Sequence, residues 1–234
     1  MCQRGRAILA HFIYSAFYEI KMYYIRCAKI ARPLWHISSV PKFPTGTFFY
    51  CDKGHLGINI IKKGGYMKMV KRVEYNRIKA LEYAKKWAYS RNPQYYNFDN
   101  VGGDCTNFIS QCIYQGANIM NYTKDFGWYY INANNKSPSW SGVEYLYNFL
   151  VNNKEQGPYG KQTNIEEIQI GDIAQLSFDG NKFAHTLLIT DIDERKEGLD
   201  KIKIASHTYD SYNKNITDYI FKKIRFVHIE GARK

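Results

Sequence analysis

The chain has 234 residues, of which 45% are hydrophobic and 16% aromatic, which suits one sizeable globular domain plus an extension and excludes disorder throughout. The formal net charge of +12 suggests an anionic partner, but the excess lies in residues 1–68, where 11 Lys and Arg side chains face only Glu19 and Asp52. Residues 69–234 carry 22 basic and 19 acidic side chains. Because this larger part is nearly balanced, nucleic acid is not the expected partner.

The cysteines are too widely spaced to form a recognised framework. They stand at positions 2, 27, 51, 105 and 112, and no two of them make a C-x-x-C pair. A disulfide scaffold or a zinc ribbon has nothing to be built from in this pattern.

Residues 1–68 are interpreted as a basic, aromatic-rich N-terminal extension. The uncharged run Ala7–Tyr18 follows two arginines, as in a secretory signal, but no small-x-small cleavage site follows it. Twelve residues are also too few to span a bilayer, which takes about 20. Residues 1–66 could instead lie on an anionic membrane surface, or form a poorly ordered terminal segment, and we favour the last interpretation. The folded domain is then expected to be residues 69–234.

Helical periodicity begins after residue 73. Pro93 ends the first helical pattern, in which Ile78 is expected on the buried face. Gly116 is expected to stop the second helix, and Ser141 and Glu144 have capping-box spacing at the start of the third. The predicted helices cover residues 74–90, 104–115 and 141–150.

The periodicity changes to that of strands after Gly157. The turn Asp179-Gly180-Asn181 and the charged segment 191–200 separate the expected strands. Because helices come first and strands follow, the sequence predicts an α+β domain in which a helical layer packs on an antiparallel sheet. The predicted strands cover residues 172–178, 184–190, 201–206 and 223–229.

The chemically informative segment is VGGDCTNFISQC, residues 101–112. Its two glycines allow a tight turn and Asp104 is a favourable N-cap, so Cys105 is expected in the first turn of a helix. Free N–H groups and the helix dipole there favour a thiolate and can donate to an oxyanion. A nucleophilic cysteine suits this position, but so does a small buried apolar residue, and placement alone leaves both open.

Cys112 lies seven residues after Cys105, on the same helix face. The separation along the axis is about 10.5 Å, which exceeds the roughly 7 Å between Cα atoms that a disulfide can bridge. We therefore expect Cys112 to be a core residue and not a redox partner of Cys105.

Two histidines are candidates for the base that a cysteine nucleophile needs. His185 begins one predicted strand and His207 follows the next, so an antiparallel hairpin would make them neighbours. A structural histidine at a strand end is the alternative for His185. His228 lies in the last strand and is expected to face solvent, whereas the remaining histidines, at positions 11, 36 and 55, belong to the extension.

These residues resemble a known family. GGDCTNFISQ (102–111), Phe183-Ala184-His185-Thr186 and His207-Thr208-x-Asp210 resemble the bacterial putative amidase domain family, which is grouped with the papain-like cysteine peptidases near the NlpC and CHAP cell-wall amidases. Tyr75-Asn76-Arg77 and Ser139-Trp140 extend the resemblance over about residues 73–230. It implies a papain-like fold in which Cys105 is the nucleophile, His185 the general base and a polar residue on the following strand the third member.

The resemblance implies a cysteine hydrolase of the amidase or peptidase type that needs no metal or organic cofactor. By analogy with neighbouring families, peptidoglycan is a candidate substrate and an extracytoplasmic or cell-wall location is favoured. His207 is predicted to be the third catalytic residue because a strand end holds it rigidly. Asp210, three residues further along in a loop, is the alternative and would also stabilise an imidazolium.

Other features leave alternatives open. Tyr96, Asp99 and Asn100 precede the nucleophile closely enough to supply a further donor or a substrate contact. Residues 122–130, with Trp128, are either a groove for glycan or peptide or, as we favour, a packed aromatic loop. Two other functional classes also remain: a catalytically silent papain-like binding module, and a binder of membranes or anionic polymers that acts through the extension.

Overall fold

The structure is a computed structural model that describes residues 22–25, 47–52, 55–60 and 71–234. The chain divides into two units, residues 1–69 and 70–234. In the first unit, strands β1 (Met22–Ile25), β2 (Thr47–Asp52) and β3 (His55–Ile60) form a small sheet, with β1 parallel to β2 and β2 antiparallel to β3. These strands were not expected from the sequence. The interpretations of Ala7–Tyr18 concern residues outside the described ones.

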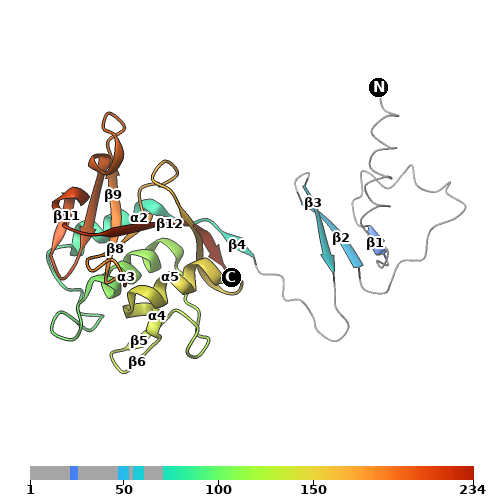
Figure 1. Cartoon of the computed structure of the whole chain (residues 1–234). Coiled ribbons are helices and arrows are strands. Elements are labelled where there is room, and N and C mark those ends of the chain that lie inside the picture. Colours follow the sequence, from blue (N-terminus) through green and yellow to red (C-terminus); the bar gives the residue numbers. More distant parts are fainter. Residues whose placement is uncertain (1–21, 26–46, 53–54, 61–70) are drawn as a thin grey trace, which may run out of the picture. The chain divides into compact units, whose positions relative to one another are not determined.

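The second unit is a mixed α+β domain, as the order of sequence patterns predicted (Figure 1). Within residues 71–234, referred to below as the described domain, a seven-stranded sheet has the order β11-β10-β9-β8-β12-β4, and β7 also pairs with β12. All of these pairs are antiparallel. The strands are β4 (Arg72–Val73), β7 (Gly157–Thr163), β8 (Ile173–Ser177), β9 (His185–Ile192), β10 (Ile202–Ser206), β11 (Ser211–Asn215) and β12 (Lys223–Arg233).

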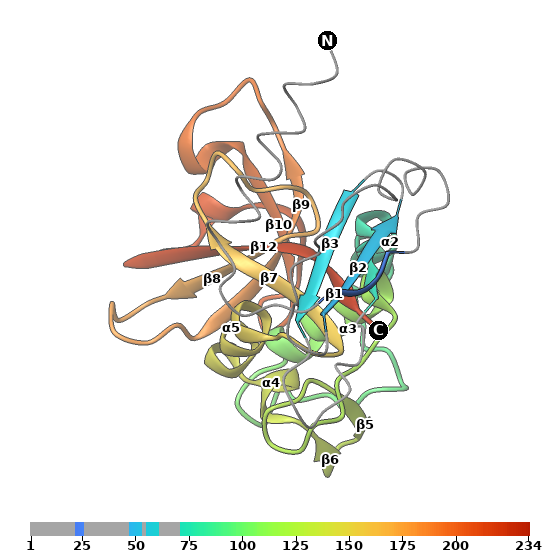
Figure 2. The ribbon, with the colours of Figure 1, turned by 90° about the vertical axis from the view of Figure 1, so that its right-hand side faces the viewer.

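Helices cover one face of this sheet. In both views α3 (Cys105–Ala117) and α5 (Val143–Asn152) lie on the same side of the strands, and they pack on β9 and β7 (Figures 1 and 2). The remaining helices are α2 (Arg77–Trp87) and the short α4 (Pro138–Ser141), with 3-10 turns η1 (Gly198–Lys201) and η2 (Ile216–Asp218) and a small β5–β6 ribbon (Tyr130–Asn132 and Asn135–Lys136). None of the described helices combines the length and the apolar character needed to cross a membrane.

Alternation along the strands divides the core into two clusters. Ile173, Leu188 and Ala205 belong to the cluster beneath the helices. Their neighbours on the opposite face, such as Ala174 and Leu187, belong to a second cluster, which residues of η2 and of the loop before β8 close. Both faces are therefore buried, which explains why β8 is buried at every position.

The first predicted helix is present, but with a different buried face. It spans Arg77–Trp87, and the side chain of Asn76 caps it by accepting a hydrogen bond from the Lys79 N–H at 3.0 Å. Ile78, expected inside, is 58% exposed, whereas Ala80, Tyr83 and Ala84 are buried. Small alanines allow α2 to approach α3 closely, and this packing outweighs the larger side chain of Ile78 in deciding which face turns inward.

Two predicted helix signals serve other purposes. The second helix passes Gly116 and ends at Ala117, with Asn118 in the left-handed conformation as its C-cap. A Cβ atom at Gly116 would collide with the ring of Tyr75, so this glycine allows close packing. The capping box at Ser141 is absent, because Gly142 caps α5 and Glu144 pairs with Arg225 instead.

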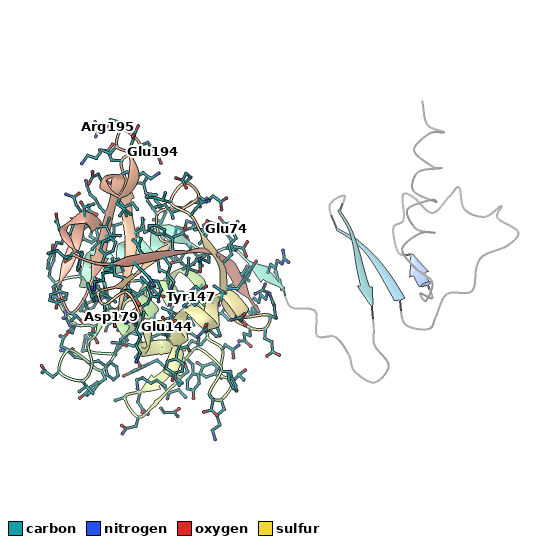
Figure 3. All side chains as sticks on the ribbon, viewed as in Figure 1. Glu74, Glu144, Tyr147, Asp179, Glu194 and Arg195 are labelled. Atoms are coloured by element: carbon teal, nitrogen blue, oxygen red, sulfur yellow. The ribbon has the colours of Figure 1, made fainter. Side chains whose placement is uncertain are left out.

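The four predicted strands correspond to β8, β9, β10 and β12 with shifted ends. The turn between β8 and β9, which contains Asp179, lies at the same end of the domain as Glu144 at the start of α5 (Figure 3). Glu194 and Arg195, in the connection between β9 and β10, mark the opposite end (Figure 3). His185, the first residue of β9, therefore lies at the Asp179 end of the sheet.

Candidate active site

The start of α3 is built by a glycine turn, as expected. Gly102 and Gly103 both have positive φ, at 86° and 98°, which a residue with a side chain rarely adopts. A Cβ on Gly103 would also crowd Thr208, whose hydroxyl accepts a hydrogen bond from the Asp104 N–H at 3.0 Å. The turn therefore docks on the segment after β10 and makes Cys105 the first residue of the helix.

Asp104 occupies the N-cap position, but its side chain does not cap the helix. One carboxylate oxygen accepts hydrogen bonds from the Phe98 N–H at 2.9 Å and the Asn107 amide at 2.8 Å. The other lies 2.7 Å from Nδ1 of His207. The expected capping role of Asp104 is therefore wrong: its carboxylate, 1% exposed, joins the helix to the preceding loop and to the end of β10.

The other polar residues of the motif are also held by tertiary contacts. Each is buried in α3 and bonds to a side chain from another element, so none is free to contact a substrate. These pairs are Thr106 with Thr186 at 3.0 Å, Asn107 with Trp140 at 2.8 Å, Ser110 with Trp128 at 3.1 Å and Gln111 with Tyr83 at 2.6 Å. These hydrogen bonds hold α3 against β9, α4, α2 and the loop that contains Trp128, and so determine the position of Cys105.

The Cys105 thiol is nearly buried, at 6% exposure. Burial raises its pKa above the usual value, although hydrogen bonds from the backbone of Thr186 and from Thr106 partly oppose this effect. Desolvation therefore opposes the thiolate that the start of the helix was expected to favour. Cys112 is fully buried in the core, as predicted, and burial raises its pKa further.

His185 begins β9 and is 2% exposed. The Ser206 hydroxyl lies 3.1 Å from Nε2 of His185, 2.9 Å from the His207 carbonyl oxygen and 3.4 Å from the Thr186 carbonyl oxygen. When its one proton goes to a carbonyl oxygen, Ser206 accepts from Nε2–H and Nδ1 is the basic nitrogen. Burial holds the pKa of His185 down at about 4, so the imidazole is neutral at pH 7. The imidazole and the Cys105 thiol are not hydrogen-bonded to each other in the described domain.

His207 does not meet His185, although β9 and β10 form the predicted antiparallel hairpin. Its ring nitrogens bond the Asp104 carboxylate at 2.7 Å and the Trp87 carbonyl at 2.8 Å. Its ring also stacks on Phe108 of α3, with centroids 3.8 Å apart. Consecutive strand residues point to opposite faces, so Ser206, one residue earlier, occupies the position expected for His207. Sequence reasoning missed Ser206.

Asp210 is likewise not in contact with His185. Both of its carboxylate oxygens accept from the Arg91 guanidinium, at 3.0 and 2.8 Å, and Arg91 also pairs with Asp99 at 2.8 Å. Tyr96 and Asn100 are exposed. Nothing in the positions of Tyr96, Asp99 and Asn100 supports the expectation that one of them donates a hydrogen bond or contacts a substrate beside Cys105.

His228 belongs to a second polar cluster that holds α2 to the sheet. Its Nδ1 lies 2.8 Å from the Asp172 carboxylate, so the expected free solvent position is wrong. Asp172, fully buried, also pairs with Arg77 at 2.6 Å and accepts the Ile229 N–H at 3.0 Å. Arg77, part of the sequence motif, therefore has a structural role. Neither this cluster nor any other among the described residues brings together three His, Cys, Asp or Glu side chains that could hold a metal ion.

The aromatic loop 122–130 is packed only in part, because residues 122–126 are exposed and residues 127–128 are buried. Trp128 is fully buried, whereas Phe126 is 85% exposed. Phe126 borders a hollow of about 510 Å³ between this loop and α5, and neither Cys105 nor His185 lines that hollow.

Comparisons with known proteins agree with the resemblance noted in the sequence. The chain is 32% identical over 141 residues to the uncharacterized protein YhbB of Bacillus subtilis strain 168, an alignment that covers 59% of this chain and 43% of YhbB. The chain thus spans less than half the length of this relative. No solved structure matches it significantly. Residues 74–229 match the family described as "Putative amidase domain", and because this region is more than half of the chain, the protein belongs to that family.

Proposed function

We propose that residues 70–234 form a cysteine-dependent amidase or peptidase domain of papain-like type, in which Cys105 is the nucleophile and His185 the general base. The main support is the position of Cys105 at the first residue of α3, next to Thr106, whose hydroxyl lies 3.0 Å from the hydroxyl of Thr186, the residue after His185. Membership of an amidase family supports the type of reaction.

The proposed reaction proceeds through a thioester. As the Cys105 sulfur attacks the amide carbonyl, its proton passes to Nδ1 of His185 and the carbonyl oxygen becomes an oxyanion. The imidazolium then protonates the amine nitrogen, the C–N bond breaks, and the acyl group remains on Cys105. Water, deprotonated by His185, attacks the thioester, releases the carboxylic acid and restores the thiol.

Ser206 is the positioning residue in this scheme. By accepting a hydrogen bond from Nε2–H of His185 it fixes the ring and keeps Nδ1 free to take the proton. The burial of Cys105 and His185 keeps both groups neutral before substrate binds, so the proton moves during the attack. His207 is proposed to act indirectly, through Asp104, in holding the start of α3.

For the substrate we propose an amide bond in a peptide, with the peptides of peptidoglycan as the first class to test. This choice rests on the resemblance to cell-wall amidases. It also accords with an extracytoplasmic location, which stays a prediction, as does membrane binding through residues 1–66.

Mass spectrometry of the intact protein tests the function. Incubation with muropeptides and a panel of peptide amides is expected to give an acyl adduct, which peptide mapping locates on Cys105. Cys105→Ala should abolish the adduct and Cys112→Ser should keep it. Product release without an adduct, persisting in Cys105→Ala, would refute the cysteine mechanism.

A catalytically silent binding module is the second candidate. It is favoured by the burial of both reactive groups and by the missing hydrogen bond between them within residues 71–234. Such a module would bind muropeptides without forming an adduct, and Cys105→Ala would bind them equally well.

A further inference from the structure

A buried hydroxyl group without a partner lies beside the proposed catalytic residues. Tyr219 follows η2 and is 9% exposed, and its hydroxyl oxygen has no hydrogen-bond partner among the described residues. The Ser211 hydroxyl is nearby, but it donates to the Tyr209 carbonyl at 2.6 Å and makes no hydrogen bond of acceptable geometry with Tyr219. An unpaired buried hydroxyl costs about 1–3 kcal/mol, so its retention calls for a reason.

The position of the ring suggests that reason. The ring centroid of Tyr219 lies 5.6 Å from that of His185, and the ammonium group of Lys214 sits 4.6 Å from the Tyr219 centroid. Burial raises the pKa of Tyr219, the neighbouring Ser211 hydroxyl opposes this rise, and Cys105 adds to it. The phenol therefore keeps its proton at neutral pH and can act as a hydrogen-bond donor.

Attack by Cys105 creates a negative charge on the substrate oxygen close to the sulfur. The first N–H groups of α3 have no partner within the helix and are one source of donors for this charge. A neutral phenol that is already desolvated is a second source of a donor.

We propose that the Tyr219 hydroxyl donates a hydrogen bond to the carbonyl oxygen of the scissile amide and to the oxyanion formed there, which makes Tyr219 a further catalytic residue. This inference rests on the proposed function, because it requires attack by Cys105 on a carbonyl. It also explains the missing partner: the substrate supplies it.

Tyr219→Phe tests the inference, because it removes only the hydroxyl. The rate at which p-nitrophenyl acetate acylates Cys105 is measured by intact mass spectrometry, and the rate of Cys105→Ala is subtracted. In Tyr219→Phe this rate should fall by on the order of 100-fold. Alkylation of Cys105 by iodoacetamide forms no oxyanion and should keep its rate. The melting temperature should stay the same or rise, because no hydrogen bond is lost.

Tyr75→Phe is the matched control. The Tyr75 hydroxyl is also buried, but it donates to the Gly171 carbonyl at 3.2 Å. Its removal should lower the melting temperature and leave acylation unchanged, the reverse of Tyr219→Phe.

The outcomes separate the two proposals. If the wild type acylates Cys105 and Tyr219→Phe does so equally fast, the role of Tyr219 is wrong and the cysteine mechanism stands. If Tyr219→Phe slows acylation and alkylation alike, the hydroxyl positions the thiol and does not bind the oxyanion, which also overturns the inference. If the wild type shows no acylation of Cys105, the proposed function and the role of Tyr219 both fail.

Discussion

Replacing His207 by alanine tests whether this histidine supports the fold or takes part in the chemistry. The change removes the partner of a buried carboxylate, Asp104, together with the hydrogen bond to the Trp87 carbonyl and the stacking on Phe108. Breaking a buried pair costs about 3–5 kcal/mol. Arg91, 3.7 Å from the same carboxylate, and the Phe98 N–H compensate in part, so we expect the free energy of unfolding to fall by about 3 kcal/mol.

At roughly 2–4 °C per kcal/mol, this loss lowers the melting temperature by about 6–12 °C, measurable by calorimetry. A double-mutant cycle with Asp104→Asn should show coupling between the two side chains, because each loses its main partner in the other's absence. Residual acylation of Cys105, measured well below the melting temperature, should persist at a reduced rate. A melting temperature within 2 °C of the wild type, combined with abolished acylation, would refute this reasoning and restore His207 as a catalytic residue.

Three further predictions concern other buried positions. His185 has a pKa of about 4 in the folded protein against about 6.5 unfolded, so the unfolded chain binds more protons between these values and the free energy of unfolding falls as the pH drops from 6.5 towards 4. Urea titrations should show that His185→Gln removes about 2 kcal/mol of the stability that the wild type loses between pH 7 and pH 5. An unchanged loss would contradict the buried neutral state of His185. At pH 7, iodoacetamide should modify Cys105 faster than Cys112 but more slowly than a free thiol, as measured by peptide mapping. The rate at Cys105 should still rise above pH 9, whereas a rate that levels off near neutral pH would indicate a thiolate. Gly116→Ala should lower the free energy of unfolding by about 1–3 kcal/mol because the new methyl group meets Tyr75, and a more stable variant would show that this contact relaxes.

The parts of the fold that depend on local pattern could be predicted from the sequence. The glycine turn before Cys105 and the β9–β10 hairpin were expected, because both follow from residue types close together in the chain. The buried face of α2 was not, because Ile78 is more apolar than Ala80 and only the close approach of α3 favours the smaller residue. The strands β7 and β11 were not predicted, because they contain few apolar residues and pairing with neighbouring strands stabilises them.

The hydrogen-bond partner of His185 shows what the pattern reasoning overlooked. The hairpin correctly brings the end of β10 beside the start of β9, but the choice of His207 ignored which face each residue occupies. Ile202 and Ile204 belong to the same cluster as Leu187, so alternation carries that face on to Ser206 and turns His207 towards α3. The signal was available in the spacing, although a serine attracts less attention than a histidine.

The polar residues of the motif suggest how the domain reconciles rigidity with reactivity. Asp104, Thr106 and Asn107 all have hydrogen-bond partners on other elements, so the first turn of α3 is held in place as the proposed reaction requires. Cys105 and His185 are left neutral by burial instead of being held as an ion pair. Such an arrangement keeps the thiol poorly nucleophilic until a substrate carbonyl is present, because thiolate and imidazolium would both be desolvated in the empty site. The protein would then gain protection of its cysteine from alkylation and oxidation in the resting state.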